Sequence, residues 1–257
     1  MKKITFSLIC VLIAAFGNQL NAQSVAASEI IQKAFAGEDV SYSNITVTGD
    51  LDLTPYLEKK DDLPSKSWWS GDGNTVDKTI KGAISFENCV FEGAVLAYIH
   101  DEESNYTFIS HFESKVNFLN CQFKKDIAFK YSDFEESVDF SGSIIAGQAN
   151  FKYAEFEEEV NFSKVVFKEL ANFKYAEYND YANYANTTFS DEANFKYAEL
   201  DHGVSFASAM FNGFLNLKYC ELEGEVNLKD IQVNGDLDTK YTEVNGMEFT
   251  SYLLKNK

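Results

Sequence analysis

Large, mostly apolar residues recur through the second half of this chain at alternating steps of five and six residues, from Phe118 to Val244 without a gap. Two residues before each of them lies a second, generally smaller residue. None of these preceding residues is charged, although 24% of the chain is Asp, Glu, Lys or Arg. Side chains two apart on an extended strand point to the same side. The pattern therefore predicts a solenoid whose residue pairs point inward while the intervening polar residues turn a corner.

The sequence also repeats with a longer period of 22 residues. The segment Phe129-Lys130-Tyr131 returns as Phe151-Lys152-Tyr153, with further copies starting at residues 173, 195, 217 and 239. The interleaved segments lack the Lys-Tyr pair. One coil is therefore predicted to use 22 residues on four short faces, with the next coil stacked about 4.8 Å above it.

The triplet Ala149-Asn150-Phe151, repeated as Ala171-Asn172-Phe173 and Ala193-Asn194-Phe195, resembles the register of the pentapeptide-repeat family in its eleven-residue variant. The resemblance covers about residues 116–244. It implies an all-β fold, a right-handed quadrilateral β-helix with Phe or Leu stacked along its axis.

The remaining segments are predicted from local patterns. Ser28 to Phe35 has helical apolar spacing and precedes Gly37, which indicates a short N-terminal capping helix that closes the first coil. The predicted divisions are a signal peptide at 1–22, the capping helix within 23–39, first coils at 40–115 with an inserted loop at 54–81 and an irregular segment at 97–106, regular coils at 116–246, and a C-terminal cap at 247–257.

The first residues have the composition of a secretory signal peptide. Lys2 and Lys3 precede an apolar stretch that ends at Phe16, and Ala22 offers a small residue for cleavage. The stretch is too short to span a bilayer, which requires about 20 residues. We expect an exported protein, periplasmic or secreted, with no transmembrane segment in its mature chain.

Net charge restricts the partners. The formal net charge is −18, and removing residues 1–22 with their two lysines makes it −20. A chain this acidic is not expected to bind nucleic acid through phosphates. It favours cations or basic surfaces as partners.

The 22-residue period places equivalent residues in vertical columns on the outside. One column is acidic, and a column of tyrosines lies beside it. The acidic ladder is Asp133, Glu155, Glu177, Glu199, Glu221 and Glu243; the tyrosine column is Tyr131, Tyr153, Tyr175, Tyr197, Tyr219 and Tyr241. A lysine column, three residues before the acidic one, is expected to offset part of its charge.

Each column has two interpretations. The acidic ladder is either a site for divalent cations or a basic partner, or a solvated face. The tyrosines either receive a sugar ring or a protein surface, or protect the corner by stacking on one another, which we favour. Trp68 and Trp69, in the predicted loop, are further candidate contacts.

Nothing in the sequence predicts catalysis or a cofactor. Cys89, Cys121 and Cys220 occupy inward positions and are interpreted as core residues. These three are the cysteines left after removal of residues 1–22, which contain Cys10, and an odd number does not form a disulfide framework. The three histidines have no metal-ligand spacing.

The leading hypothesis is a non-catalytic exported scaffold that presents acidic and aromatic faces to an unknown protein or polysaccharide, with a possible homodimer through the apolar C-terminal end. Two alternatives remain open. Some pentapeptide-repeat proteins resemble a DNA duplex and bind the gyrase class of topoisomerase, so the resemblance and the negative charge allow a DNA mimic. The second alternative is an envelope protein that binds divalent cations on the acidic ladder.

Overall fold

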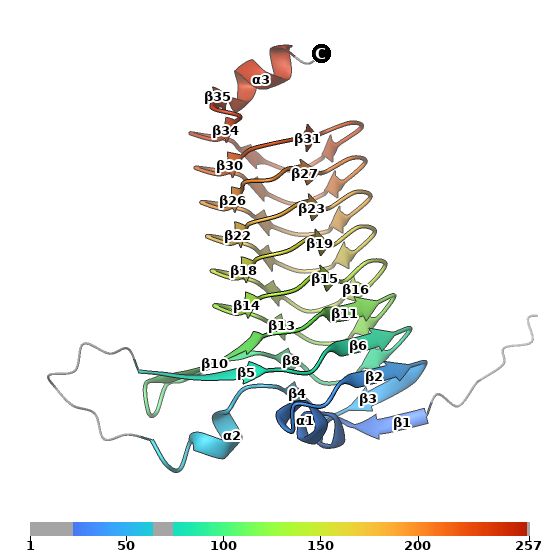
Figure 1. Cartoon of the computed structure of the whole chain (residues 1–257). Helices are drawn as coiled ribbons and strands as arrows, with labels where there is room; N and C mark the ends of the chain where they lie inside the picture. Colours follow the sequence, from blue (N-terminus) through green and yellow to red (C-terminus); the bar gives the residue numbers. More distant parts are fainter. Residues whose placement is uncertain (1–22, 64–73, 256–257) are drawn as a thin grey trace, which may run out of the picture.

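The chain folds into a right-handed β-helix with four flat sides (Figure 1). The computed structural model describes residues 23–63 and 74–255. Each side is a sheet of short strands stacked along the helix axis, and every pairing between successive coils is parallel. We name the four sheets A, B, C and D. In each coil the chain passes through sheets B, A, C and D in that order, so sheet A lies opposite sheet D and sheet B lies opposite sheet C.

The strands of sheets A and B are as follows. Sheet A consists of β1 (Gln23–Ala26), β3 (Ile45–Thr48), β7 (Val90–Phe91), β12 (Gln122–Phe123), β16 (Ile144–Ile145), β20 (Val166–Phe167), β24 (Thr188–Phe189), β28 (Met210–Phe211) and β32 (Gln232–Val233). Sheet B consists of β2 (Val40–Ser43), β6 (Ile84–Glu87), β11 (Val116–Leu119), β15 (Val138–Asp139), β19 (Val160–Asn161), β23 (Ala182–Asn183), β27 (Val204–Ser205) and β31 (Val226–Asn227).

The other two sheets complete the coil. Sheet C consists of β4 (Leu51–Asp52), β8 (Val95–Leu96), β13 (Ile127–Ala128), β17 (Ala149–Asn150), β21 (Ala171–Asn172), β25 (Ala193–Asn194), β29 (Leu215–Asn216) and β33 (Leu237–Asp238). Sheet D consists of β5 (Thr75–Ile80), β10 (Tyr106–Phe112), β14 (Asp133–Phe134), β18 (Glu155–Phe156), β22 (Glu177–Tyr178), β26 (Glu199–Leu200), β30 (Glu221–Leu222), β34 (Glu243–Val244) and β35 (Met247–Glu248), with β9 (Tyr98–Asp101) paired to β10.

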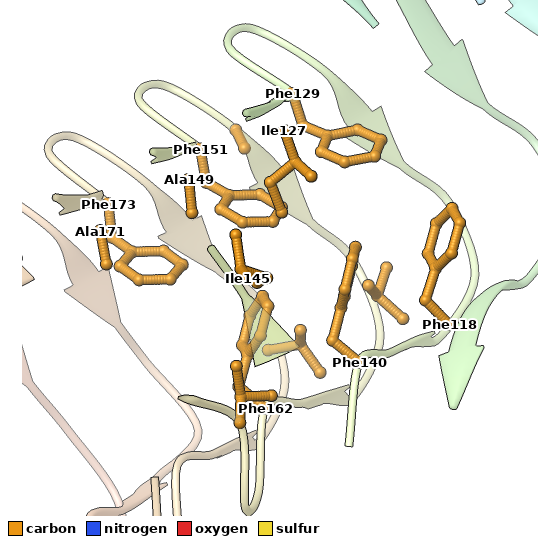
Figure 2. Close-up of a cluster of buried hydrophobic side chains, with 14 of the residues drawn as sticks. Phe118, Ile127, Phe129, Phe140, Ile145, Ala149, Phe151, Phe162, Ala171 and Phe173 are labelled. Atoms are coloured by element: carbon orange, nitrogen blue, oxygen red, sulfur yellow. The ribbon is translucent and has the colours of Figure 1, made fainter. Parts of the chain in front are cut away.

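The core is a set of vertical stacks of aromatic rings (Figure 2). Phe173, which has no exposed surface, stacks on Phe151 at a centroid distance of 5.2 Å and on Phe195 at 4.9 Å. The smaller residue of each pair, such as Ala171, fills the space beside the rings. The predicted inward positions are buried from Val116 to Leu222, which confirms the fold inferred from the sequence.

The N-terminus differs from the prediction in detail. Residues 23–26 form the strand β1, which pairs in register with β3, so they belong to a coil and not to the cap. The capping helix α1 follows at Ala27–Phe35 and buries Ile30 against the first coil. Ser28 lies inside its first turn, and the N-cap residue is Ala26, whose side chain makes no capping hydrogen bond.

The two predicted irregular segments contain regular elements among their described residues. The loop predicted at 54–81 contains the short helix α2 (Tyr56–Lys59) and strand β5, whose Ile80 is fully buried in sheet D. The segment predicted as irregular at 97–106 carries β9 and the start of β10, which form an antiparallel hairpin. Both segments fall outside the repeat pattern: β5 pairs with β10, which follows 32 residues later, and β9 folds back locally on β10. Trp68, Trp69 and the predicted signal peptide lie outside the described residues.

The C-terminal end is only partly closed. Helix α3 (Phe249–Lys255) follows β35 and packs on β34 and β35 of sheet D (Figure 1). Leu237, in the last strand of sheet C, is 47% exposed. Inward residues of this last coil are more exposed than their counterparts below because no coil lies above them. Among the described residues, no helix is long and apolar enough to cross a membrane.

Candidate functional site

Sheet D carries the predicted acidic ladder on its outer surface. Five in-register pairings connect its members in succession, from Asp133↔Glu155 to Glu221↔Glu243. Side chains alternate along each strand, so the carboxylate points outward while the following residue, such as Phe156, enters the core. The ladder therefore exists as a straight row of carboxylates, one per coil.

One coil closer to the N-terminus, a histidine occupies the position that the carboxylates have in this row. His111 of β10 lies below Asp133, whose carboxylate Oδ2 is 2.8 Å from Nδ1 of the ring. The backbone N–H of Asp133 also donates to Nδ1 at 3.2 Å, which requires the neutral ring. The hydrogen bond to Asp133 raises the pKa of His111, with a further contribution from Asp77. Protonation thus turns Nδ1 from an acceptor of the backbone N–H into a donor to the carboxylate.

The six predicted tyrosines occupy the corner between sheets C and D. Their rings stack face to face at centroid distances of 4.7–4.9 Å, with interplanar angles of 0–20°. Each ring thus covers the faces of its neighbours, and the edges point to solvent. The outer face of Tyr241, which is 56% exposed, is the free end of the stack. This geometry supports the interpretation that the tyrosines protect the corner by stacking on one another, because a sugar needs a free ring face on which to stack.

All six tyrosines adopt the left-handed backbone conformation, with φ between 57° and 62°. Bulky residues rarely do so, and the strain costs about 1–3 kcal/mol per residue. The corner between sheets B and A also needs positive φ, and there the residues vary. They are Asn120, Gly142, Lys164, Asn186, Ser208 and Asp230. Stacking of about 0.5–1.5 kcal/mol per pair offsets the strain at the tyrosine corner.

The lysine column contacts the tyrosines and not the acids. In each of the six Lys-Tyr pairs the lysine Nζ lies 4.6–5.4 Å from the centroid of the adjacent tyrosine ring. Burial and the neighbouring Lys130 lower the pKa of Lys152. Within the described part of the chain, no ion pair joins this column to the acidic ladder. The lysine column therefore offsets the negative charge of the acidic ladder only by electrostatic attraction at a distance, without direct ion pairs.

Carboxylates next to the ladder add to its negative potential. Glu157 follows Glu155 on the same side, and the Asn179 amide donates to both, at 3.1 Å and 3.4 Å. Burial raises the pKa of Glu155, and Glu157, Asp133 and Glu177 raise it further. Burial likewise raises the pKa of Glu199, followed by Glu177, Glu221 and Asp201.

We predict that the central tyrosine stack stabilises the fold. Tyr175→Ala removes two stacked contacts and one cation–π contact, and should lower the free energy of unfolding by about 2 kcal/mol. Tyr175→Asn should be less destabilising than the alanine variant, because asparagine tolerates positive φ. Urea unfolding of the three proteins measures both differences. Equal stability of all three would mean that the stack contributes nothing.

We also predict higher stability in mild acid. The folded-state pKa values of His111, Glu155 and Glu199 are raised, so the folded protein binds these protons more tightly than the unfolded chain. Their stabilising effect is complete below the unfolded values of 6.5 and 4.5 and is lost as the pH rises through the folded values. The Tm should therefore increase from about pH 8 to about pH 5.

A pair of matched variants tests the source of this pH dependence. The double variant Glu155→Gln with Glu199→Gln should show a smaller change of Tm with pH at the acidic end of this range. Glu169→Gln with Asp191→Asn removes the same charge from exposed positions between sheets A and C, and should leave the profile unchanged. Lowered pKa values at Asp101 and Glu248 oppose the trend only near and below their unfolded values of 3.8 and 4.5.

The remaining candidates for chemistry, among the described residues, do not gather into one site. Cys89, Cys121 and Cys220 are fully buried thiols, and Cys220 lies in a different wall from the other two. His100 contacts Thr107 at 2.9 Å in the β9–β10 hairpin, far along the chain from His202. Among the described residues, no three His, Cys, Asp or Glu side chains are placed to hold a metal ion.

Sequence reasoning missed two features of these surfaces. It placed His111 in no column, because the 22-residue spacing to Asp133 starts outside the regular repeats. It also did not bring Cys89 near Cys121, since these residues are 32 apart and the hairpin between them hides their stacking. A search for repeats that allowed insertions would have found the cysteine pair, and counting back by one further coil of 22 residues from Asp133 would have found His111.

Comparison with known proteins agrees with this geometry. A family model described as pentapeptide repeats (9 copies) matches residues 110–155 and 151–199, which lie in the regular coils. No curated protein and no solved structure matches the chain. Proteins of this repeat type are generally non-enzymatic. The repeat match, the four parallel sheets and the axial phenylalanine stacks together identify the regular coils of this chain as pentapeptide repeats.

Proposed function

We propose that this protein is an exported, non-catalytic scaffold whose acidic ladder binds a protein partner with a basic surface. The observation that carries the proposal is the unbroken ladder, in which six carboxylates stand in register and none is paired with the adjacent lysine column. Like charges at about 4.8 Å repel by roughly 1 kcal/mol per neighbour in water. A basic partner relieves that repulsion.

A protein partner fits this face better than a polysaccharide. The rings from Tyr131 to Tyr219 cover one another, so they leave no series of free faces for sugars. The carboxylates, by contrast, form a flat row at the spacing of β-strands. Arginine and lysine side chains on a partner can meet such a row with charge-assisted hydrogen bonds.

The binding test compares two double variants of equal charge. Glu199→Gln with Glu221→Gln removes two neighbouring carboxylates of the ladder, whereas Glu169→Gln with Asp191→Asn removes two stacked carboxylates from another corner. Each protein is used as bait for the envelope and secreted fractions of its host. We expect a retained protein that the ladder variant loses and the control keeps. Equal retention by both variants would exclude the ladder.

Export is supported by the sequence of the first residues, in which Lys2 and Lys3 precede an apolar stretch that ends at Phe16 and Ala22 offers a small residue for cleavage. N-terminal sequencing of the protein from its native host should begin at Gln23. A protein that keeps Met1 and stays in the cytoplasm would instead favour the DNA-mimic alternative.

The cation-binding alternative has a separate test. Calorimetric titration with calcium should give no heat above the dilution control if the ladder serves a basic partner alone. Saturable heat that disappears in Glu199→Gln with Glu221→Gln would favour the cation site.

The partly closed C-terminal end supports an additional partner, a second copy of this chain. Strands β31, β32 and β33 are the last in their sheets among the described residues, and of these β31 is contacted by α3, since the Tyr252 hydroxyl donates to the Val226 carbonyl at 3.2 Å. Leu237 and Leu254 are exposed at this end, and a cavity of about 100 Å³ lies between the last coils and α3, lined by apolar side chains such as Leu222 and Phe249. An identical end offers the same apolar groups and strand edges in a two-fold arrangement.

We predict that Leu237→Asp makes the protein monomeric. Leu57→Asp is the matched control, since Leu57 is 65% exposed on α2 at the other end of the molecule. Light scattering after gel filtration gives the mass of each protein. Dimers are expected for the unmodified chain and the control. A monomeric unmodified chain would exclude this interface.

A further inference from the structure

Two buried cysteines stack on each other in adjacent coils. Cys89 directly precedes β7 and Cys121 directly precedes β12, and these strands pair in parallel with Val90 opposite Gln122. The backbone N–H of Gln122 donates to the Cys89 carbonyl at 2.8 Å. Both side chains point inward, and neither has exposed surface. The two residues therefore occupy neighbouring places in one vertical column of the core.

Both sulfur atoms contact backbone carbonyls of strand β6. The Cys89 Sγ is 3.3 Å from the Glu87 carbonyl oxygen, and the Cys121 Sγ is 3.5 Å from the Phe86 carbonyl oxygen. Both thiols thus border the same short stretch of β6. The neighbouring Cys121 thiol lowers the pKa of Cys89, while Cys89 and burial raise the pKa of Cys121.

The backbone geometry suits a covalent bond. Neighbouring strands lie about 4.8 Å apart, and disulfides join Cα atoms separated by about 4.4–6.8 Å. The Cβ atoms of such a pair need to approach each other by less than about 1 Å to reach the usual disulfide separation. The left-handed corners at Asn88 and Asn120 directly precede the two cysteines, so both begin their strands from the same type of turn.

We propose that Cys89 and Cys121 form a disulfide that joins consecutive coils of the β-helix. The Cys89 thiolate attacks one sulfur of a disulfide donor, such as glutathione disulfide, and releases a thiol. Cys121 then attacks the Cys89 sulfur of the mixed disulfide and releases the second thiol. Two thiols of the protein are oxidised, the donor disulfide is reduced to two thiols, and the two thiol protons pass to the released thiolates.

The bond forms as the coils assemble, because the folded thiols are closed to solvent. It closes the segment that contains the β9–β10 hairpin, where the regular repeat is interrupted. A link at this point holds together the two coils on either side of the interruption. The disulfide proposal rests in part on the proposed export, since disulfides persist in oxidising compartments. The refolding test of the disulfide does not depend on export.

The first test refolds the reduced full-length chain in a glutathione redox buffer. The product is alkylated in denaturant without reductant and digested for mass spectrometry. Cys89 and Cys121 should be protected and appear in one cross-linked peptide, while Cys220 is alkylated. Alkylation of Cys89 and Cys121 to the same extent as Cys220, or linkage of either to another thiol, would overturn the proposal.

Matched variants measure the consequence of the bond. Reduction should lower the Tm of the refolded protein by roughly 5–10 °C. Cys121→Ser should abolish this response, and serine is tolerated in this column because Ser143 occupies it one coil above. Cys220→Ser should keep the response. A response that persists in Cys121→Ser would contradict the assignment.

Analysis of the protein purified from its native host distinguishes failure of the disulfide proposal from failure of the export proposal. A chain that begins at Gln23 and carries the cross-linked peptide supports both. A chain that keeps Met1 and has both thiols reduced, while the refolded protein forms the bond, contradicts export and leaves the disulfide assignment in place.

Discussion

Phe173→Asp is expected to abolish folding of the central coils, with loss of the cooperative unfolding transition or a large fall in Tm. Phe173 has no exposed surface, and it stacks on Phe151 and Phe195 while its edges meet Phe162 and Tyr184. Removing such a ring costs about 3–5 kcal/mol, and an unpaired buried carboxylate adds several kcal/mol more. These costs together approach the total stability of about 5–15 kcal/mol that is usual for a protein.

The effect should spread to both neighbouring coils, because each repeat is stabilised mainly by contacts with the repeats beside it. Circular dichroism with thermal melting measures the loss. Ile144→Asp is the matched control, since Ile144 is 39% exposed on the outer side of sheet A and accepts a charge in solvent. A Tm for Phe173→Asp equal to that of the control would contradict the inward assignment.

Tyr178→Phe and Tyr184→Phe are each expected to lower the free energy of unfolding by about 1–3 kcal/mol. These two tyrosines are almost fully buried, and their hydroxyl oxygens are 2.7 Å apart inside the core. Burial raises the pKa of both, so they stay neutral and share one hydrogen bond. Each single substitution leaves the other hydroxyl without its partner in a low-dielectric environment.

The double variant should be much less destabilised than the sum of the singles, and close to the unmodified protein. It removes both polar groups and leaves phenylalanine, which already occupies the adjacent positions Phe156 and Phe162 in the same stacks. Urea unfolding of the four proteins gives the coupling energy between the hydroxyls. Additive losses would show that the two hydroxyls do not depend on each other.

The regular coils could be predicted from sequence because the side-chain rule is local. A large residue and a smaller one two positions earlier must share one side of a strand, and only a closed coil buries every such pair. Once the coil length is known, the column of Glu155, Glu177 and Glu199 follows from counting residues. The arrangement of the acidic ladder and of the tyrosine corner was therefore predicted correctly, while their binding role stays a proposal.

The segments outside the repeat could not be predicted in the same way. Strand β5 and the β9–β10 hairpin have no periodic counterpart. Strand β5 pairs with β10 at a separation of 32 residues, more than one coil length, and β9 folds back locally on β10. The β9–β10 insertion hid the stacking of Cys89 on Cys121, while His111 lies one coil length before Asp133 in a strand that precedes the regular repeats.

The sequence by itself determined which side chains enter the core and which stand in columns outside, because strand alternation and coil length are fixed by the covalent chain. Only the tertiary structure decided what those columns contact. The lysines lie over tyrosine rings and not beside the carboxylates, the tyrosine faces cover one another, and α3 closes only part of the last coil. Such choices depend on side-chain rotamers and on contacts between distant segments, which a repeat pattern does not specify.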